Sequence, residues 1–209
     1  MIEVRTVYQV KFGKIDQAVQ LFRRLPQIVA GVAPVEEIHY HLLSDVSGPM
    51  YTLVDELVIP SLGDWEPAQQ RLFAHPEFGE WFKGFQQFIE GGRNEFYTIE
   101  GECEEWSRPG VMVVRESYRA KQWQIRAAVS LLQRYGALMV DTGVGQRPRI
   151  TTDMSGPMFQ AAIEIETDSL AEWETRRRAL YQRPEFQYWF VQLLGAVEAG
   201  AHEFYRVEV

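Results

Sequence analysis

The sequence has a single cysteine, fewer basic than acidic residues and no long apolar run. Cys103 alone excludes an intrachain disulfide framework and a multi-cysteine metal site. Acidic residues outnumber basic ones by 29 to 21, so no basic surface is expected to neutralise phosphates, and nucleic acid is not an expected partner. No run of 18 apolar residues and no leader-like N-terminal pattern occur. We therefore expect a cytoplasmic protein without a membrane partner.

Motifs that mark a catalytic or cofactor site are also missing. The sequence contains no nucleophile elbow, phosphate-binding loop or zinc-binding helix motif. His75 precedes Pro76 at an expected helix junction, and no wider haem pattern surrounds it. No cofactor and no metal site are therefore predicted.

The sequence contains an internal repeat of one unit. The stretch "DVSGPM" at 45–50 returns as "DMSGPM" at 153–158, and a shift of 108 aligns 45–97 with 153–205 without a gap. In this alignment 21 of the 53 positions are identical. Nearer the N-terminus the best shift is 110, which places Arg5 on Arg115. Copies of this length are typical of duplicated small domains rather than of solenoid repeats. We predict a first domain at 1–100, a linker at 101–110 and a second domain at 111–209.

Each copy has the element order of a ferredoxin-like domain. In the first copy, residues 3–12 alternate as a strand, and apolar residues from 15 to 25 follow helical spacing. Strands are expected at 35–43, 50–59 and 94–99, with "DVSGP" as the turn between the first two of these. Two helices joined at His75-Pro76 fill the remaining interval, and Gly91-Gly92 is expected to end the second one. The predicted fold class is α+β, with two tandem β-α-β-β-α-α-β units.

Such a four-stranded antiparallel sheet has helices on one face only, and its other face also needs cover. The simplest solution is to pack the two bare sheet faces together within one chain. This predicts an intramolecular barrel, in which a monomer carries an internal pseudo-dimer. The sequence leaves open whether the chain also forms a homo-oligomer.

Several segments resemble the NIPSNAP group of the dimeric α/β-barrel superfamily. The similar segments are "EVRTVYQVKFGKIDQAVQLF", "SGPM" and "SLGDWEPAQQRLFAHPEF", and the likeness extends over both copies. The resemblance implies a tandem form in which one chain supplies both halves of a barrel. Proteins of this fold include cofactor-independent monooxygenases, haem-binding enzymes, isomerases and proteins without known activity, so the fold does not determine the function.

Strand alternation predicts which side chains line the space between the two sheets. Glu56 and Glu164 are expected on the inner faces, with Arg5 and Arg115 on neighbouring strands beside them. One reading is an acid or base beside an arginine that binds an anion, and the other is a structural ion pair in each half. Asp55 breaks the pattern, because it falls on the face that should meet the helices.

Two further sets of residues are candidates for the same space. Tyr97 and Tyr205 lie on the last strands and are candidates to orient a substrate or donate a proton, although a packed aromatic is the commoner role. His39 and His41 share one face of the second strand, and the second copy has Arg147 and Arg149 there. A metal at the two histidines lacks a third ligand in the sequence, so we assign these four residues to ligand binding.

The leading hypothesis is that a central cavity binds a small, partly apolar organic molecule. Whether the protein transforms this molecule stays open, and a cofactor-independent monooxygenase or an isomerase would suit the candidate residues. The alternative is a non-enzymatic protein-interaction module whose barrel is filled with side chains.

Overall fold

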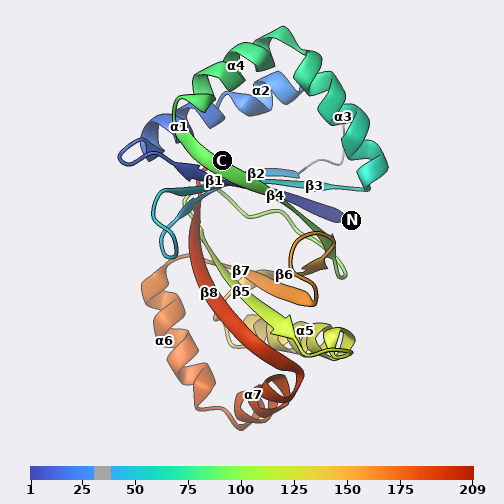
Figure 1. The fold of residues 1–209 in the computed structure, drawn as a ribbon. Helices are drawn as coiled ribbons and strands as arrows, with labels where there is room; N and C mark the ends of the chain where they lie inside the picture. Colours follow the sequence, from blue (N-terminus) through green and yellow to red (C-terminus); the bar gives the residue numbers. More distant parts are fainter. Residues whose placement is uncertain (31–38) are drawn as a thin grey trace. The chain divides into compact units, whose positions relative to one another are not determined.

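The computed structural model describes residues 1–30 and 39–209. The chain divides into two compact units, which are considered separately here (Figure 1). Unit 1 comprises Met1–Asp45, Pro49–Phe96 and Glu208–Val209, and unit 2 comprises Val46–Gly48 and Tyr97–Val207. Within the described ranges, no helix is long and apolar enough to cross a membrane.

Both units show the predicted alternation of strands and helices. Unit 1 contains β1 (Ile2–Val10), α1 (Ile15–Phe22), α2 (Leu25–Ala30), β2 (His39–Asp45), β3 (Thr52–Ile59), α3 (Leu62–Ala74), α4 (Pro76–Gln86) and most of β4 (Ile89–Ile99). Unit 2 contains β5 (Met112–Ala120), α5 (Ile125–Asp141), β6 (Gln146–Asp153), β7 (Gln160–Thr167), α6 (Leu170–Tyr181), α7 (Pro184–Ala196) and β8 (Val197–Val207). The predicted α+β class with repeated ferredoxin-like elements is confirmed.

The strands of each unit pair in the order expected for this fold. In unit 2, β5 lies between β7 and β8, and β6 pairs with the other edge of β7. In unit 1, β3 lies between β1 and β2, and every one of these pairings is antiparallel. The helices of each unit lie on one face of its sheet (Figure 1). A side chain on a strand therefore points either toward the helices of its own unit or away from them.

The first helical segment differs between the two units. In unit 2 it is the continuous helix α5, whereas in unit 1 it is divided into α1 and α2. Pro26 lies at the start of α2, at the position that Gly136 occupies within α5. A proline has no N–H to donate to the carbonyl four residues earlier, which here belongs to Phe22, the last residue of α1. The helical spacing predicted over 15–25 is thus divided between two helices in unit 1.

The last strands begin earlier than the sequence predicted. Gly91-Gly92 was expected to end a helix, but both glycines lie within β4. A Cβ atom on Gly92 would come within 3.1 Å of the Tyr8 ring, and one on Gly200 would come within 2.8 Å of the Tyr118 ring. Each glycine thus leaves room for a tyrosine ring of the neighbouring strand, a role that glycine often has within strands. The predicted strand at 35–43 is observed from His39, and its earlier part lies outside the described residues.

Candidate functional site

The charged residues that the sequence assigned to the inner faces form a row in unit 2. Arg115 on β5 lies opposite Glu164 on β7, and Glu164 lies opposite Arg149 on β6. Arg115 donates a hydrogen bond to Glu164, and Arg149 Nη1 lies 3.9 Å from the second carboxylate oxygen. All three side chains are buried. Two arginines thus surround one carboxylate, which supports the structural reading of this group.

The segment before β5 covers part of this row. Arg149 lies over the ring of Trp106, with its guanidinium carbon 4.4 Å from the ring centre, and it also donates to the carbonyl oxygen of Glu104. Glu166 accepts hydrogen bonds from the backbone N–H and the hydroxyl of Ser107, and Arg147 lies 3.4 Å from it. The residues expected to be a linker are therefore packed against the sheet of unit 2.

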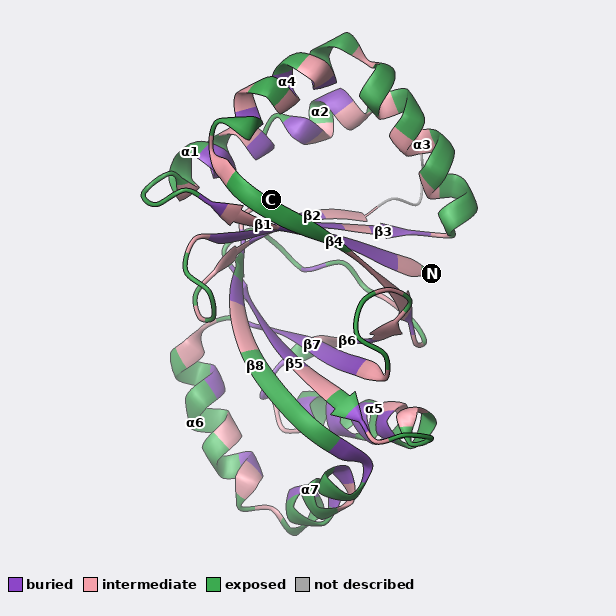
Figure 2. Cartoon of the chain, in the orientation of Figure 1, coloured by how far each residue is buried: buried purple, intermediate pink, exposed green. Residues whose placement is uncertain are grey.

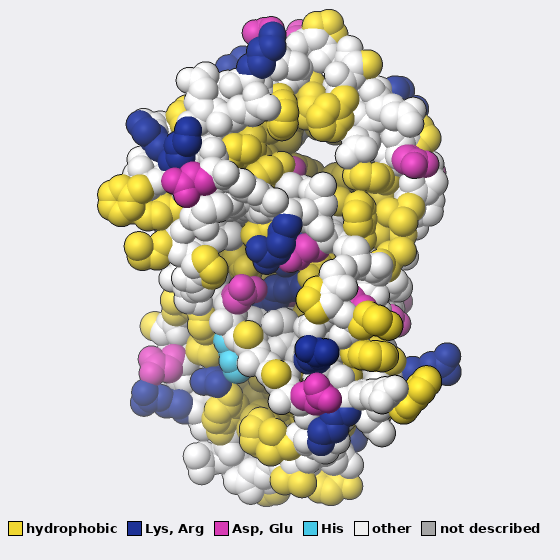
Figure 3. All heavy atoms as spheres, viewed as in Figure 1, with side chains coloured by type: hydrophobic (Ala, Val, Ile, Leu, Met, Phe, Trp, Pro, Cys, Tyr) yellow, Lys and Arg dark blue, Asp and Glu magenta, His cyan; other side chains and the backbone are white. Residues whose placement is uncertain are grey.

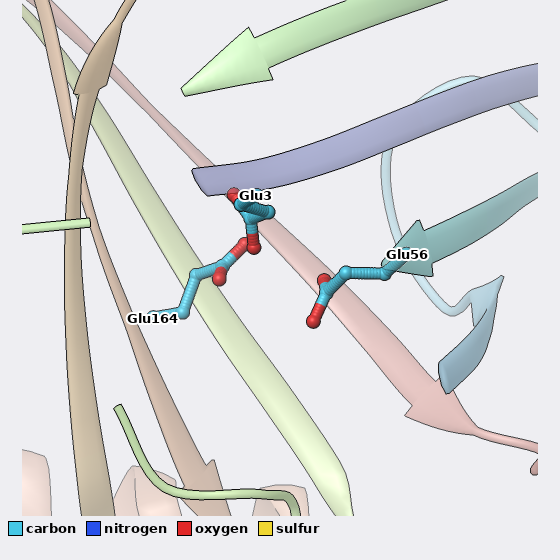
Figure 4. A group of neighbouring side chains, drawn as sticks. All are labelled: Glu3, Glu56 and Glu164. Atoms are coloured by element: carbon cyan, nitrogen blue, oxygen red, sulfur yellow. The ribbon is translucent and has the colours of Figure 1, made fainter. Parts of the chain in front are cut away.

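Unit 1 has the corresponding row. Arg5, Glu56 and His41 lie opposite one another on β1, β3 and β2, at the positions of Arg115, Glu164 and Arg149. Arg5 forms an ion pair with Glu95, with 3.1 Å between Nη1 of the arginine and the carboxylate. The carboxylate of Glu56 lies within 4.8 Å of that of Glu3 on β1. Figure 4 shows these two side chains together with Glu164, which belongs to unit 2.

The remaining predicted residues lie beside these rows or apart from them. The Tyr97 ring lies under the guanidinium of Arg115 at 5.0 Å, and the Tyr205 hydroxyl donates to Glu203 at 3.0 Å. His39 lies two residues before His41 on β2 and is partly exposed. Each unit therefore groups its own predicted residues, with Arg5, His41 and Glu56 in unit 1 and Arg115, Arg149, Glu164 and Tyr97 in unit 2, and the role assigned to each of them stays a prediction.

The described part of the chain contains a cavity on the opposite face of the unit 1 sheet. It has a volume of about 460 Å³ and lies between β1 to β4 on one side and α2, α3 and α4 on the other. Its walls are mostly apolar, with Trp65, Phe73, Phe78, Trp81 and Phe82 on the helix side. Figure 3 shows unit 1 hollowed here, with hydrophobic side chains around the opening. The size and the apolar walls are typical of a small-molecule site.

The cavity exists because the helices of unit 1 cover their sheet less closely than those of unit 2. No residue of α3 is buried, whereas Trp173 and Leu180 are buried in α6 at the positions of Trp65 and Leu72 (Figure 2). In unit 2, Gly136 brings α5 so close to Pro148 that a Cβ atom on it would meet the proline at 2.9 Å. Tyr40 lies at the position of Pro148 in unit 1, and its larger side chain lines the cavity.

One acidic residue is found among the described residues that line this cavity. Asp55 on β3 lies directly opposite Thr6 on β1, and both residues face the helices with Tyr8 and Tyr40. The pKa of Asp55 is raised to about 7, and burial is the largest cause. A hydrogen bond from the Tyr40 hydroxyl lowers this pKa in part, and the charge of Glu56 on the other face of the strand raises it further. The side chain is still partly accessible, because the carboxyl faces the cavity. Burial and the Asp55 charge raise the pKa of both tyrosines, so their hydroxyls stay protonated at neutral pH.

Unit 2 also has an acidic residue on the helix side of its sheet, but the carboxylate of this residue is hydrogen-bonded to neighbouring side chains. Glu116 lies at the position of Thr6, and it is paired across the strands with Ile163, which lies at the position of Asp55. Its carboxylate accepts hydrogen bonds from the hydroxyls of Tyr118 at 2.5 Å and Tyr135 at 3.2 Å. The Tyr135 ring stacks on Trp189 at 4.1 Å, within a packed hydrophobic cluster. Glu116 is therefore a satisfied core residue.

The cavity lies on the helix side of unit 1's third strand, whereas the sequence placed its candidate residues on the other face, and that placement stays a prediction. The signal was present, because Asp55 interrupts the apolar face of that strand. Thr6, Tyr8 and Tyr40 gave no comparable signal, since such residues are common on sheet faces. The cavity depends on how closely helices approach a sheet, which strand alternation does not encode.

Solved structures share the fold of this chain. A candidate monooxygenase from Fusobacterium nucleatum matches with a TM-score of 0.72 at 9% identity, over 100% of this chain and 92% of its own. An anthrone oxidase-like protein matches with a TM-score of 0.64 at 15% identity, over 99% of this chain and 90% of its own. An uncharacterised NIPSNAP-domain protein from Burkholderia xenovorans matches over 50% of this chain and 100% of its own, at 15% identity and a TM-score of 0.43.

The whole-chain matches confirm the predicted fold, which is that of dimeric α/β-barrel proteins. No family model and no curated protein matches the sequence. Activity therefore has to be argued from the residues of the site.

Proposed function

We propose that the chain binds a small, mostly apolar organic molecule in the cavity of unit 1. The observation that carries this proposal is an apolar space of about 460 Å³ with a small group of polar side chains on its sheet side. An apolar pocket with few, convergent polar groups is the usual form of a small-molecule site.

The test is binding of the neutral fluorescent probe 1-anilinonaphthalene to the wild type and to two variants. Ala68→Phe places a ring on α3 at a residue that lines the cavity. Ala74→Phe adds the same ring at an exposed residue of α3 that is not among the lining residues. We expect saturable binding to the wild type and to Ala74→Phe, and binding at least about tenfold weaker to Ala68→Phe, because the added ring occupies the space of the probe. Equal binding to all three proteins, or no saturable binding to the wild type, would contradict the proposal.

Chemistry on the bound molecule is a second candidate, and Asp55 is the observation that favours it. A carboxyl with a pKa near neutrality suits a general base that removes a proton from a substrate carbon or hydroxyl. An isomerase would return the proton at another carbon. A cofactor-independent monooxygenase would let the deprotonated substrate reduce O₂, as when anthrone and O₂ give anthraquinone and water.

Oxygen uptake with anthrone as the substrate tests the monooxygenase activity directly. We expect uptake by the wild type that falls by at least about 100-fold in Asp55→Asn, the usual scale for loss of a general base. Uptake that Asp55→Asn leaves unchanged would exclude Asp55 as the base. Uptake no faster than that of buffer would exclude anthrone as the substrate.

A further inference from the structure

Among the residues that the structure describes, the cavity has an apolar body and one acidic group, Asp55, at its floor. The polar side chains around Asp55 are Thr6 and Tyr8 from β1 and Tyr40 from β2, and β4 adds Arg93 and Asn94 to the lining. Among the described residues that line the cavity, Asp55 is the only one with a carboxyl. A ligand that reaches the floor therefore meets two tyrosine hydroxyls, one threonine hydroxyl and one carboxyl.

The opposite wall is aromatic. Phe78 stacks on Trp81 and on Phe82, with ring centres 5.4 Å and 5.9 Å apart, and Phe73 packs edge-on against Phe78 at 5.0 Å. Trp65 contributes a further ring from α3. These rings offer a large apolar surface to the body of a ligand whose charged end lies at Asp55.

The other described charges near Asp55 are one arginine that is paired with a carboxylate and one glutamate on the opposite face of the sheet. Arg93 is the one basic residue among the described lining residues, and its Nε donates to Glu95 at 2.7 Å. Glu56 lies on the opposite face of β3 and adds negative potential at Asp55. Tyr8 on β1 and Tyr40 on β2 stay neutral, and the described lining residues of α2, α3 and α4 carry no ionisable side chain.

We propose that the unit 1 cavity selects hydrophobic amines, with the ammonium group held by Asp55 and the apolar part against the α3 and α4 rings. This proposal rests on the proposed ligand-binding function and adds the class of ligand. An ammonium beside an ionised carboxylate makes a charge-assisted hydrogen bond, which a neutral hydroxyl of the same shape makes less strongly. An anionic group at Asp55 would be repelled by the carboxylate, and Arg93, the one basic residue among the described lining residues, is already paired with Glu95.

The experiment compares two isosteric competitors of 1-anilinonaphthalene. These are 2-(1-naphthyl)ethylamine and 2-(1-naphthyl)ethanol, which differ only in the terminal group. At pH 8 we expect the amine to compete at least about tenfold better than the alcohol with the wild-type protein. This ratio tests the proposal without any substitution.

Two variants test whether Asp55 causes the preference for the amine. Asp55→Asn should bring the amine to the level of the alcohol while both still compete for the probe. Glu116→Gln changes the acidic residue on the same face of unit 2 and should keep the wild-type preference. At pH 5.5 the amine should bind the wild type at least about tenfold more weakly than at pH 8, because Asp55 is then mostly protonated, and Asp55→Asn should show no such change.

The outcomes separate the two proposals. Equal competition by amine and alcohol with the wild type would overturn amine selection and leave the cavity as a site for neutral molecules. A preference for the amine that survives in Asp55→Asn would overturn the assigned contact. Failure of the probe itself to bind would contradict the proposed function of the cavity.

Discussion

Replacing Asp55 with asparagine should stabilise the protein at high pH and much less at low pH. The carboxyl has a pKa of about 7 in the folded chain, compared with its ordinary value of 3.8, because burial disfavours its charge. The folded state therefore holds a proton that the unfolded chain has already released. A group with a raised folded-state pKa stabilises fully below the unfolded pKa, and this contribution is lost as the pH rises toward the folded pKa. The affected window runs from about pH 4 to pH 7.

The magnitude follows from the size of the shift. About three pKa units at 1.36 kcal/mol each correspond to about 4 kcal/mol as an upper bound, since water in the cavity reduces the desolvation of the carboxyl. Between pH 5 and pH 8 the wild type should lose about 2.5 kcal/mol of this contribution, and the neutral asparagine should lose none.

The assay is urea unfolding at pH 5 and pH 8, followed by far-ultraviolet circular dichroism. The difference in the free energy of unfolding between Asp55→Asn and the wild type should increase by about 2.5 kcal/mol from pH 5 to pH 8. Glu80→Gln is the control, because Glu80 is an exposed carboxylate on α4, and its difference from the wild type should hardly change. A difference for Asp55→Asn that is the same at both pH values would refute the reasoning, as would an Asp55 carboxyl that titrates near pH 4 by NMR.

Three further substitutions, one of them with a matched control, test unit 2. Gly200→Ala should lower the free energy of unfolding by about 1–3 kcal/mol, because its Cβ would lie 2.8 Å from the Tyr118 ring. The control Gly195→Ala on α7 has no neighbour within 4 Å and should not destabilise, so equal losses of unfolding free energy for the two variants in urea titrations would contradict this. Tyr135→Phe removes a hydroxyl that donates to Glu116 and should cost about 1 kcal/mol, and an unchanged midpoint would show that the hydrogen bond contributes nothing. Trp123 is exposed and has a left-handed backbone (φ 69°), and the corresponding residue of unit 1 is Gly13 at φ 70°. Trp123→Gly should therefore raise Tm by relieving backbone strain of about 1 kcal/mol. A lower Tm would show that contacts of the indole ring stabilise the fold instead.

The fold could be predicted because the sequence pattern of each helix and strand occurs in both copies of the duplicated unit. Alternating strands, the repeated "SGPM" turn and the serine N-caps at Ser61 and Ser169 are local signals, and both serines accept a hydrogen bond from the backbone N–H three residues later. The pairing of Arg115 with Glu164 also followed from strand alternation. The break between α1 and α2 was readable from Pro26, but the regular apolar spacing around it favoured one helix.

The cavity could not be predicted in the same way, because it depends on distances between layers. Trp65 and Leu72 have the same identities as Trp173 and Leu180, yet only the latter pair is buried. The difference arises at other positions, where Pro26 and Tyr40 replace Gly136 and Pro148 and change how a helix can lie over the sheet.

The contrast between the units is itself an argument that the cavity has a purpose. Unit 2 shows that this fold can fill the space beneath its helices with aromatic and aliphatic side chains and can satisfy the acid at the floor with two tyrosines. Unit 1 keeps the same turn and helix motifs but leaves the space open and places a carboxyl there that burial holds near neutrality. Unfilled apolar space and a desolvated carboxyl both lower stability, and natural proteins have little stability in reserve. Folding alone does not require either feature in unit 1, whereas a ligand that fills the space and pairs with the carboxyl would offset both.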